Sequence, residues 1–271
     1  MASQRPSSGA TVELEGVGVR YGSFPAVQNV GFRVPAGQFV ALVGPTGCGK
    51  SSILNLVAGL LAPSEGRVAA LGKPVTGVNR QAAYMFQADA LMPWKTALEN
   101  VMLGPLLRGA SRQEAATEAR EWLFRVGLTD FERRYPHQLS GGQRKRVAMA
   151  QALINRLPLL LMDEPFSALD AQTRALMEQE LLGLREQLGA TVLFVTHDLE
   201  EAIALSDRVL LFTAGPDATL KGDHAVDLPR PRNVVEARFM AGFQQVYDRV
   251  WKDLRDEVMA SYERQRSGTA R

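Results

Sequence analysis

Hydrophobic and polar residues alternate at the start of the chain. Apolar residues recur mostly at every second position in two stretches, residues 12–19 and 30–34. This period is typical of half-buried antiparallel strands. The next apolar stretch, residues 39–43, is unbroken, which is typical of a parallel strand covered on both faces. We therefore predict an N-terminal β lobe that leads into the first strand of a buried sheet.

The period then changes to that of helices. Residues 52–61 carry their apolar side chains on one face, which predicts a helix directly after the first buried strand. From about residue 88 to residue 157 the chain is rich in helix-forming residues, above all at 113–126 and 147–154. We interpret residues 88–157 as an inserted helical lobe.

Apolar strand-like runs return after the insertion, at residues 159–162, 192–195 and 209–212. Two helices, at residues 171–188 and 199–204, are predicted between them. Strands that alternate with helices indicate a mostly parallel sheet. The α/β core therefore resumes and continues to about residue 212.

The C-terminal part begins with a segment that cannot be helical. Residues 228–232 contain two prolines, which interrupt any helix. Beyond them, apolar residues repeat every three or four positions and predict a docked terminal helix: Phe239, Phe243, Val246, Val250 and Leu254. The predicted organisation is a disordered tail (1–10), one domain (11–232, with core and β lobe at 11–87 and 158–232) and a C-terminal helical extension (233–271) with a disordered end.

Composition and charge exclude several classes of protein. The 271 residues are 46% hydrophobic and carry a formal net charge of only +2, so the chain can bury a large core and has no strong field for nucleic acid. No run approaches the eighteen apolar residues that a membrane-spanning helix needs, and no secretory signal is visible. The single cysteine excludes an intrachain disulfide. We expect a chain that stays in the cytoplasm.

A glycine-rich loop follows the first buried strand. Residues 44–51 match the pattern G-x-x-x-x-G-K-S, with the predicted helix after them. Glycines allow consecutive amides to converge on one phosphate, and the helix N-terminus adds its positive end. Lys50 supplies a charge for the β- and γ-phosphates, and the Ser51 hydroxyl can bind Mg²⁺. The alternative is a glycine-rich turn without a ligand.

Two carboxylates end the strand at residues 159–162. Asp163 is in the position to hold Mg²⁺, and Glu164 can act as general base toward the water that attacks the γ-phosphate. The alternative is a pair of acidic residues that only caps a strand.

A second motif, Leu-Ser-Gly-Gly-Gln at residues 139–143, lies about ninety residues after the loop. A given string of five residues occurs by chance about once in a million positions. Ser140 is in the N-cap position of the helix that continues through Val147, and the two glycines leave the backbone bare toward an anion. The alternative is an ordinary Ser-Gly-Gly turn.

Together the two motifs resemble the nucleotide-binding subunits of ABC transporters, over roughly residues 12–212. The resemblance implies an α/β fold, with a P-loop NTPase (RecA-like) core, an N-terminal antiparallel β lobe and an inserted helical subdomain. It implies ATP and Mg²⁺ as ligands and two subunits packed head to tail, so that the 139–143 motif of one covers the nucleotide of the other. The residues implied to hold the nucleotide are Tyr21, Gly44, Pro45, Thr46, Gly47, Cys48, Gly49, Lys50, Ser51, Ser52, Ser140, Gly141, Gly142, Gln143 and Asp170.

Four smaller matches assign roles by the same resemblance. Tyr21 matches the aromatic residue that stacks on adenine, and Gln87 matches the glutamine that contacts the metal and the attacking water. Asp170 matches an aspartate at the subunit interface, and His197 matches the histidine that contacts the γ-phosphate. The implied catalytic residues are thus Glu164, Gln87 and His197, and the implied metal ligands are Ser51, Gln87 and Asp163. Each of the four could instead be structural: a core tyrosine, a polar loop residue, a helix N-cap and a strand-end histidine.

Within the family, residues 91–101, 197–202 and 227–232 resemble subunits of nitrate, sulfonate and taurine importers. This implies a bacterial importer subunit that lies peripherally on the cytoplasmic side of the inner membrane. Its partners would be a second copy or a similar subunit, separate permease chains and, indirectly, a substrate-binding protein. We expect residues 91–94 to contact the permease.

Two residues depart from the family pattern. Lys145 stands where glutamine or methionine is usual, and Gln151 stands where arginine is common. We expect neither to touch the chemistry, although both put a routine permease contact in doubt. Cys48 is at a variable position of the loop, and we expect alkylation of its thiol to block ATP binding.

Other classes of protein remain as alternatives. A soluble ABC ATPase that works on nucleic acid or ribosomes commonly has two nucleotide domains or a long coiled coil, and this chain has one set of motifs and no sustained heptads. A non-importer ABC subunit, a plain P-loop kinase or GTPase, and a scaffold that binds without turnover are the others. The 139–143 motif and the intact Glu164 disfavour the last two.

Overall fold

The computed structural model describes residues 10–268. The predicted tail at residues 1–10 lies outside the described residues except for Ala10, which is the first residue of strand β1 (Ala10–Tyr21). Residues 269–271, at the expected disordered end, also lie outside. None of the helices within residues 10–268 combines the length and apolar content needed to cross a membrane.

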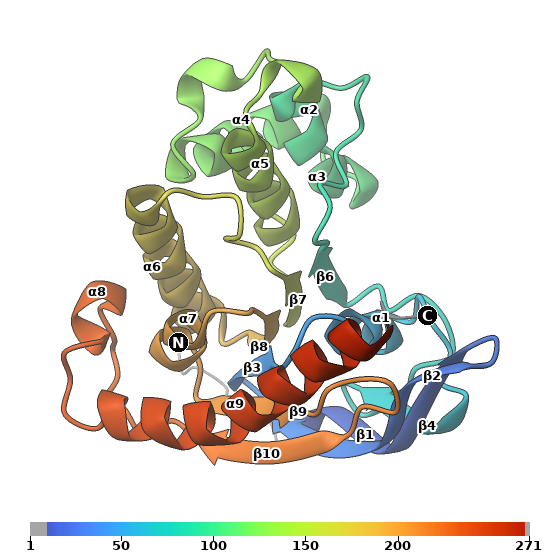
Figure 1. Cartoon of the computed structure of the whole chain (residues 1–271). Coiled ribbons are helices and arrows are strands. Elements are labelled where there is room, and N and C mark those ends of the chain that lie inside the picture. The colour runs from blue at the N-terminus through green and yellow to red at the C-terminus, as the bar shows by residue number, and fades with distance from the viewer. Residues whose placement is uncertain (1–9, 269–271) are drawn as a thin grey trace.

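The centre of the molecule is a six-stranded sheet with the order β10-β9-β3-β8-β7-β6 (Figure 1). Five of these strands run parallel, and β10 pairs antiparallel with β9 at one edge. The bounds are β3 Phe39–Val43, β6 Ala82–Met85, β7 Leu159–Asp163, β8 Thr191–Val195, β9 Arg208–Phe212 and β10 Leu220–Ala225. Strands β3, β7 and β8 are buried at every position, as their unbroken apolar runs predict.

Alternate residues of the sheet belong to two different cores. On β3, Phe39, Ala41 and Val43 pack into one apolar cluster and Val40 and Leu42 into the other. The first cluster includes residues of α6 (Ala171–Leu188), α7 (Leu199–Leu205) and the inserted helices. The second includes α1 (Lys50–Ala58) and the β lobe. Both faces of the sheet are therefore covered, and the strands lie at defined positions in the core. The polar loops begin where these strands end.

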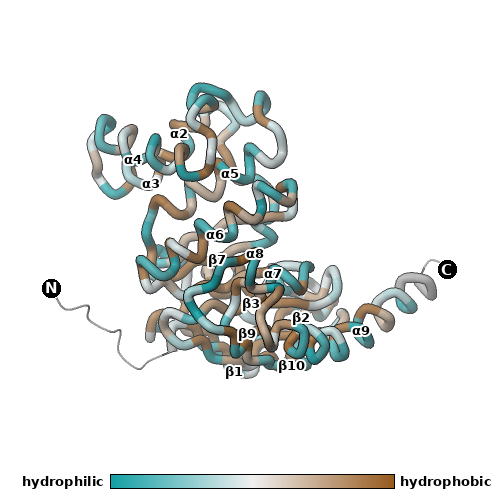
Figure 2. The backbone as a smooth tube through the Cα atoms, turned by 90° about the vertical axis from the view of Figure 1, so that its left-hand side faces the viewer, coloured by the Kyte–Doolittle hydropathy of each residue, from teal (hydrophilic) through white to brown (hydrophobic). Residues whose placement is uncertain are grey.

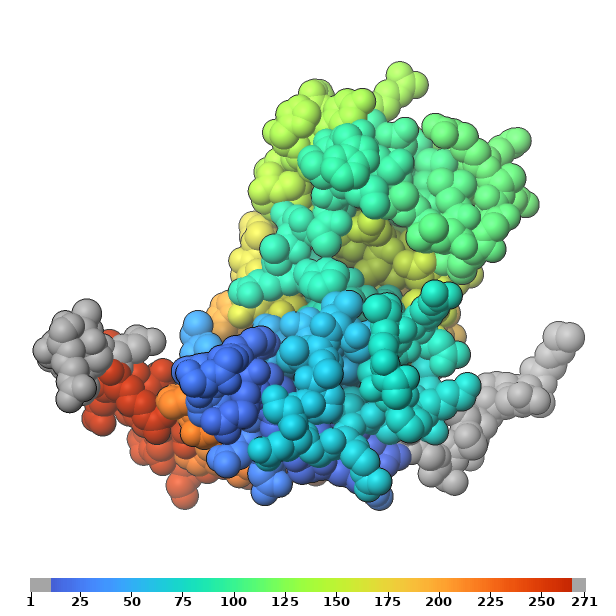
Figure 3. Space-filling view, turned by 90° about the vertical axis from the view of Figure 1, so that its right-hand side faces the viewer, coloured from blue at the N-terminus to red at the C-terminus, as the bar shows by residue number. Residues whose placement is uncertain are grey.

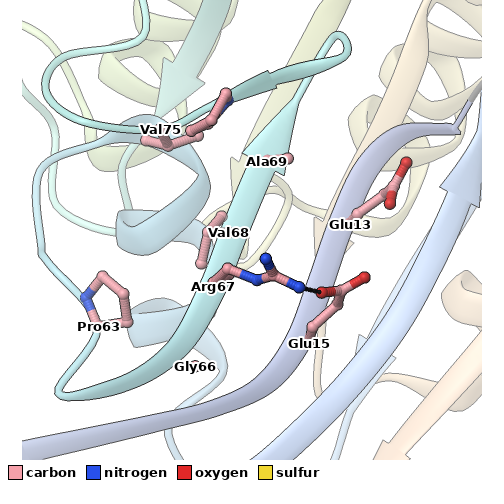
Figure 4. Close-up of a pocket in the computed structure, with 9 residues that line it drawn as sticks. Glu13, Glu15, Pro63, Gly66, Arg67, Val68, Ala69 and Val75 are labelled. Carbon is pink, nitrogen blue, oxygen red and sulfur yellow. Dashed lines mark hydrogen bonds and ion pairs between the residues drawn. The ribbon is translucent and has the colours of Figure 1, made fainter.

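The β lobe is a four-stranded antiparallel sheet with the order β2-β1-β4-β5. It pairs β1 with β2 (Phe24–Pro35) and with β4 (Glu65–Ala70), which forms a hairpin with β5 (Lys73–Pro74). Its outer face has a hollow of about 420 Å³, lined in part by Glu13, Glu15 and Arg67 (Figure 4). Arg67 donates to Glu15 Oε2 at 2.6 Å, and this hydrogen bond lowers the pKa of the Glu15 carboxyl. Both side chains are exposed, so the pair adds little stability.

The inserted lobe is helical and stands above the sheet between β6 and β7 (Figures 1 and 2). Its elements are α2 Ala97–Val101, α3 Leu103–Leu107, α4 Arg112–Arg125, the 3-10 turns Thr129–Phe131 and Pro136–Gln138, and α5 Gly141–Leu153. Thr96, Ser111 and Ser140 each cap a helix, and each forms a capping box with the residue three positions later. Trp122 is 2% exposed, and burial of such an aromatic side chain contributes roughly 1.5–3 kcal/mol.

The C-terminal part returns to the sheet through α8 (Val234–Ala237) and ends in α9 (Phe243–Gly268). Helix α9 runs along β10 and then projects away from the body (Figure 2). Phe243, Val246, Val250 and Leu254 are buried, as their spacing predicts. The prediction for Phe239 is wrong, because it lies in the turn between α8 and α9 and is 86% exposed. Periodicity does not show where one helix ends and the next begins.

Candidate active site

Four loops with predicted site residues leave the same edge of the central sheet. Parallel strands end together at their carboxyl edge, where ligands of open α/β sheets bind. Here β3, β6, β7 and β8 lead into the segments around residues 44–51, 87, 163–170 and 197. Among these loops is a cavity of about 270 Å³, lined by Tyr21, Phe24, Ala26, Thr46, Gly47, Gly49, Lys50, Ser51, Ser52, Gln87, Glu164, Val195 and His197.

The loop after β3 turns on glycines with positive φ angles, among them Gly44 (153°) and Gly49 (91°). A Cβ at Gly49 would lie 2.4 Å from Val27 Cγ2, and a Cβ at Gly44 would lie 2.9 Å from the carbonyl oxygen of Phe212. Helix α1 then begins without a side-chain cap and without an acidic residue in its first turn. The N-terminal amides of α1 therefore meet no competing carboxylate, which suits the binding of an anion.

The Lys50 ammonium group folds back onto this loop. Its Nζ donates to the carbonyl oxygens of Gly44 at 2.8 Å and Pro45 at 2.9 Å. Lys50 is only 8% exposed. The loop thus holds a positive charge in place before any ligand binds. Three residues of the loop do not line the cavity: Gly44, Pro45 and Cys48.

The structure leaves the Cys48 thiol little access to a modifying reagent. Cys48 is fully buried in the apolar cluster beneath the β lobe. Burial raises the pKa of its thiol, against the opposing effect of Lys50. The thiolate is the reactive form, so we expect slow alkylation of the folded chain.

Ser51 and Asp163 lie together, although they are far apart in the sequence. The Ser51 hydroxyl lies close enough to the Asp163 carboxyl group to lower its pKa, and Asp163 is 4% exposed at the end of β7. Burial raises the pKa of Asp163, and the charge of Glu164 raises it further. A hydroxyl and a buried carboxylate side by side are oxygen ligands of the kind that Mg²⁺ prefers.

Glu164 is held between two other predicted residues. Gln87 Nε2 donates to Glu164 Oε2 at 3.3 Å, and His197 Nδ1 lies 3.5 Å from Glu164 Oε1. Glu164 itself has a φ angle of 47°, which is uncommon for a residue with a side chain and is often found at functional sites. The structure therefore brings Gln87, Glu164 and His197 from three different strand ends to one point.

An aromatic pair lies at the rim of the cavity. Tyr21 is 50% exposed, and its hydroxyl lies 2.9 Å from Ser52 Oγ. Phe24, which pairs with Tyr21 across the turn between β1 and β2, is also 50% exposed and lines the cavity. The sequence analysis missed Phe24. The available signal was a second aromatic residue directly across a tight turn, where cross-strand neighbours meet.

The 139–143 motif is separate from this cavity, because none of Ser140, Gly141, Gly142 and Gln143 lines it. Ser140 Oγ accepts from Gln143 N at 3.2 Å, and Gln143 Oε1 accepts from Ser140 N at 2.8 Å. A Cβ at Gly142 would lie 3.0 Å from the carbonyl oxygen of Ala168, so the motif packs against the loop after β7. The turn is closed by its own capping box at the surface of the helical lobe.

Asp170 is the N-cap residue of α6, which is the structural role given above as the alternative to an interface role. Its carboxylate accepts from Thr173 N at 3.0 Å at the start of α6, and this hydrogen bond lowers its pKa. Asp170 is exposed and lies outside the cavity. The structure of one chain therefore does not bring Asp170 to the phosphate loop.

Lys145 does not line the cavity, but it contacts the backbone of a residue that does. Lys145 is 4% exposed on α5, and its Nζ donates to the carbonyl oxygens of Gln87 at 2.5 Å and Phe86 at 3.2 Å. Burial lowers the pKa of Lys145, and the charges of Asp89, Asp163 and Glu164 act in the opposite direction. Lys145 lies on α5, the helix that begins within the 139–143 motif, and it thus contacts the backbone of Gln87, whose side chain donates to Glu164.

A second groove, of about 770 Å³, lies between β6 and the helices α3 and α5. Its apolar lining includes Phe86, Met92 and Leu107, and Leu107 is 88% exposed. Gln151, the other departure from the family pattern, also lines it. Within the predicted contact segment 91–94, Leu91 is buried in the core and does not line the groove, whereas Met92 does.

The chain is similar to known proteins along most of its length. Residues 27–167 match the family model described as ABC transporter. The chain is 47% identical over 242 residues to the aliphatic sulfonates import ATP-binding protein SsuB of Yersinia pestis bv. Antiqua, covering 89% of this chain and 86% of that protein. It is 40% identical over 247 residues to the nitrate import ATP-binding protein NrtC of Synechococcus elongatus, covering 90% of this chain and 36% of that protein.

Among solved structures, the chain is similar to the ATP-binding cassette MJ0796, described as a dimer in a post-hydrolysis state bound to ADP and Pi. The TM-score is 0.73 and the identity is 35%, over 80% of this chain and 100% of that one. A second structure of MJ0796, described as a dimeric bacterial ABC transporter cassette, is also similar. Its TM-score is 0.74 and its identity is 33%.

Proposed function

The chain belongs to the ABC transporter family and is an ATPase, and from that premise we propose that it powers import of a small oxyanionic solute such as a sulfonate or nitrate. The family and the fold class predicted from the sequence are thereby confirmed. The solute class rests on the relatives, and the observation that supports ATP hydrolysis as the source of power is the convergence of Gln87 and His197 on the Glu164 carboxylate, in the cavity that also contains Lys50.

The phosphate loop fits the triphosphate of ATP. The amides at the start of α1 and the Lys50 ammonium would hold the β- and γ-phosphates, because both are positive and neither faces a carboxylate of its own loop. Thr46, Gly47 and Ser52 also line the cavity there. Tyr21, with Phe24 beside it, would stack on the adenine ring at the rim.

Ser51, Asp163 and Gln87 fit a bound Mg²⁺, since a hydroxyl, a buried carboxylate and an amide oxygen are hard ligands. When bound, Mg²⁺ neutralises charge that develops on the phosphate oxygens.

Hydrolysis needs a group that orients the attacking water and takes its proton. Glu164 would do this, because Gln87 donates to one of its carboxylate oxygens and His197 lies 3.5 Å from the other, which favours one orientation of the carboxylate. His197 is 66% exposed and stays within reach of a γ-phosphate in the cavity. The three side chains act as one unit, in which Gln87 and His197 position Glu164.

Two copies of the chain would form two composite sites. Ser140, Gly141, Gly142 and Gln143 are at the surface of the helical lobe and have no phosphate to bind within their own chain. A partner packed head to tail would bring its phosphate loop to this turn, with Asp170 at the interface. ATP binding would bring the two chains together and hydrolysis would let them separate. This cycle of closing and opening would supply the movement that drives transport.

The groove beside α3 and α5 would receive the permease. On the face shown in Figure 3, the segment around residues 80–107 spans the boundary between the helical lobe and the β lobe. The groove contains exposed apolar side chains such as Leu107, which suit a docked helix. The chain would thus lie peripherally at the cytoplasmic side of the membrane, and a substrate-binding protein would deliver solute from the other side.

Replacement of Glu164 by glutamine tests this function. We expect ATP hydrolysis to fall by at least about 100-fold, the usual contribution of a general base, while ATP affinity stays within about twofold. Release of phosphate and binding of a fluorescent ATP analogue measure the two quantities. Glu180→Gln, on α6 and outside the cavity, where Glu180 pairs with Arg125, is a control that should hydrolyse ATP normally. Full activity in Glu164→Gln would contradict the proposal.

The permease interface is tested by Leu107→Asp. We expect the variant to hydrolyse ATP alone at the wild-type rate and to lose co-purification with the membrane chain, because the substitution places a charge in the apolar groove. Leu176→Asp, an exposed leucine on α6 outside the groove, is the control. Unchanged co-purification of Leu107→Asp would exclude this groove as the docking site.

A further inference from the structure

Lys145 is a buried ammonium group on α5, and α5 is the helix that begins with the Ser140 turn. Among the residues whose burial the structure describes, the buried lysines and arginines are Lys50, Lys145 and Arg232. Removal of an ammonium group from water is strongly unfavourable unless hydrogen bonds replace the lost hydration. A buried lysine is therefore expected to have a defined set of partners.

The acceptors that Lys145 finds are backbone carbonyl oxygens of one short segment. Its Nζ donates to Gln87 O at 2.5 Å and to Phe86 O at 3.2 Å. Arg144 adds a second connection, because its Nε donates to Asp89 Oδ2 at 2.9 Å. The first turns of α5 thus hold residues 86–89 at both ends of the segment.

The same segment contacts Glu164. The Gln87 side chain donates to Glu164 Oε2, while the Gln87 carbonyl oxygen accepts from Lys145. A displacement of α5 therefore moves the backbone that carries the Gln87 amide. A neutral side chain at position 145, such as glutamine or methionine, cannot make the same pair of charge-assisted hydrogen bonds.

We infer that Lys145 is a positioning residue that links the Ser140 turn to the hydrolytic group of the same chain, through the backbone of Gln87. The inference rests on the proposed function. When α5 shifts toward the nucleotide of the partner, Lys145 carries Gln87 with it and sets the direction of the Glu164 carboxylate. Each subunit thereby adjusts its own water-orienting group to the state of the opposite site.

The test compares three variants with the wild type. Lys145→Met keeps the length and removes the donors, Lys145→Arg keeps the charge, and Lys252→Met makes the same change at an exposed lysine of α9. We expect Lys145→Met to fold, because an unbranched apolar side chain is tolerated where a buried charge is removed. The melting temperature of each variant is measured first, and Lys145→Gln replaces Lys145→Met should the latter be unfolded.

Two readouts distinguish positioning from simple stability. In Lys145→Met we expect kcat for ATP to fall about 10-fold or more with KM within about twofold, because a misplaced group affects the chemical step and not binding. Lys145→Arg should recover kcat to within about threefold of the wild type. In the nucleotide-free protein, amide hydrogen exchange of residues 86–90 should be faster in Lys145→Met and unchanged in Lys252→Met.

Several outcomes would overturn the inference. They are a wild-type kcat in Lys145→Met, an equal fall in Lys145→Arg and Lys145→Met, or unchanged exchange of residues 86–90. The proposed function fails separately, when the wild-type chain hydrolyses no ATP. The exchange experiment needs no nucleotide, so it decides on Lys145 in that case too.

Discussion

Two helix N-termini of this chain are assigned to phosphate, and they are built in different ways. At α1 the loop is mounted on a buried strand, the helix has no side-chain cap, and Lys50 is folded into the loop. At α5 the turn lies at the surface, and the Ser140 hydroxyl and the Gln143 side chain satisfy its amide groups through a capping box. The N-terminus of α1 leaves its amide groups free to bind a ligand. The N-terminus of α5 already has some of its amide groups hydrogen-bonded by its own side chains.

This difference indicates a division of labour. An uncapped N-terminus with a buried ammonium binds an anion strongly and alone. A capped and exposed N-terminus adds little until a second surface brings a phosphate to it and excludes water. We therefore expect the α1 site to set the nucleotide affinity of one chain, and the α5 site to set the affinity of two chains for each other.

The largest expected effect is from Gly49→Ala compared with Gly141→Ala. A Cβ at Gly49 has both a left-handed φ and a contact of 2.4 Å with Val27, whereas a Cβ at Gly141 meets only Arg144 Nη2 at 3.9 Å. We expect Gly49→Ala to weaken nucleotide binding by at least about 100-fold and Gly141→Ala to leave it unchanged in the monomer. Titration calorimetry measures both affinities.

Lys50→Met repeats this test for a chain in which Gly49→Ala does not fold. It removes the charge without a new Cβ contact, and we expect a loss of about 10- to 100-fold in affinity. Equal losses at the α1 and α5 sites would remove the distinction between them.

Thiol chemistry gives the next largest contrast. Cys48 is buried with a raised pKa, and a cysteine introduced as Ser140→Cys would be exposed at the start of a helix. We expect iodoacetamide at pH 8 to modify the introduced cysteine about 30- to 100-fold faster than Cys48, because the thiolate fraction and the access are both higher. Mass spectrometry of the intact chain measures the rates.

Alkylation of Cys48, once forced, should still abolish ATP binding. A Cβ built at Gly44 lies only 3.0 Å from the Cys48 sulfur, so the loop has no room for an adduct. Cys48→Ala supplies the unreactive background. Fast modification of Cys48 in the native wild type would show that the phosphate loop is less tightly packed than its burial indicates.

The smallest effect is expected from Ser140→Ala, introduced together with Glu164→Gln. Loss of the cap destabilises the chain by about 1 kcal/mol, which lowers the melting temperature by roughly 2–4 °C. Ser111→Ala removes an equivalent capping box from α4 and is the matched control. We expect both variants to lose this stability, and only Ser140→Ala to weaken ATP-dependent dimerisation, by about 10-fold. Equal dimerisation of the two would exclude a phosphate contact at Ser140.

Much of the fold follows from local sequence signals. Strands β3, β7 and β8 are unbroken apolar runs, and α6 has both its start and its end at the predicted residues. Strand β10 was not predicted, because its sequence is mostly polar and small and it pairs at the edge of the sheet. The exposed Phe239 shows the opposite error, in which an apolar spacing continues across a turn.

The site divides in a similar way. Residues of the phosphate loop, Asp163 and Glu164 are recognisable because their chemistry requires a fixed local order. Lys145 and Phe24 are not, since their roles depend on segments that come close only in the folded chain: the carbonyl oxygens of residues 86–87 for Lys145, and the far side of a hairpin for Phe24. Cys48 and Leu91 are buried although residues near them in the sequence are exposed. The sequence motif alone does not show which of these side chains is buried.

The most direct test of the central claim is the mass of Glu164→Gln in solution with and without nucleotide. The claim is that one nucleotide is held between the α1 site of one chain and the α5 site of another. Sedimentation velocity should give the mass of one chain, 29.6 kDa, with ADP, and about twice that mass with saturating ATP and Mg²⁺. A chain that remains monomeric with ATP and Mg²⁺ at saturation would contradict the account.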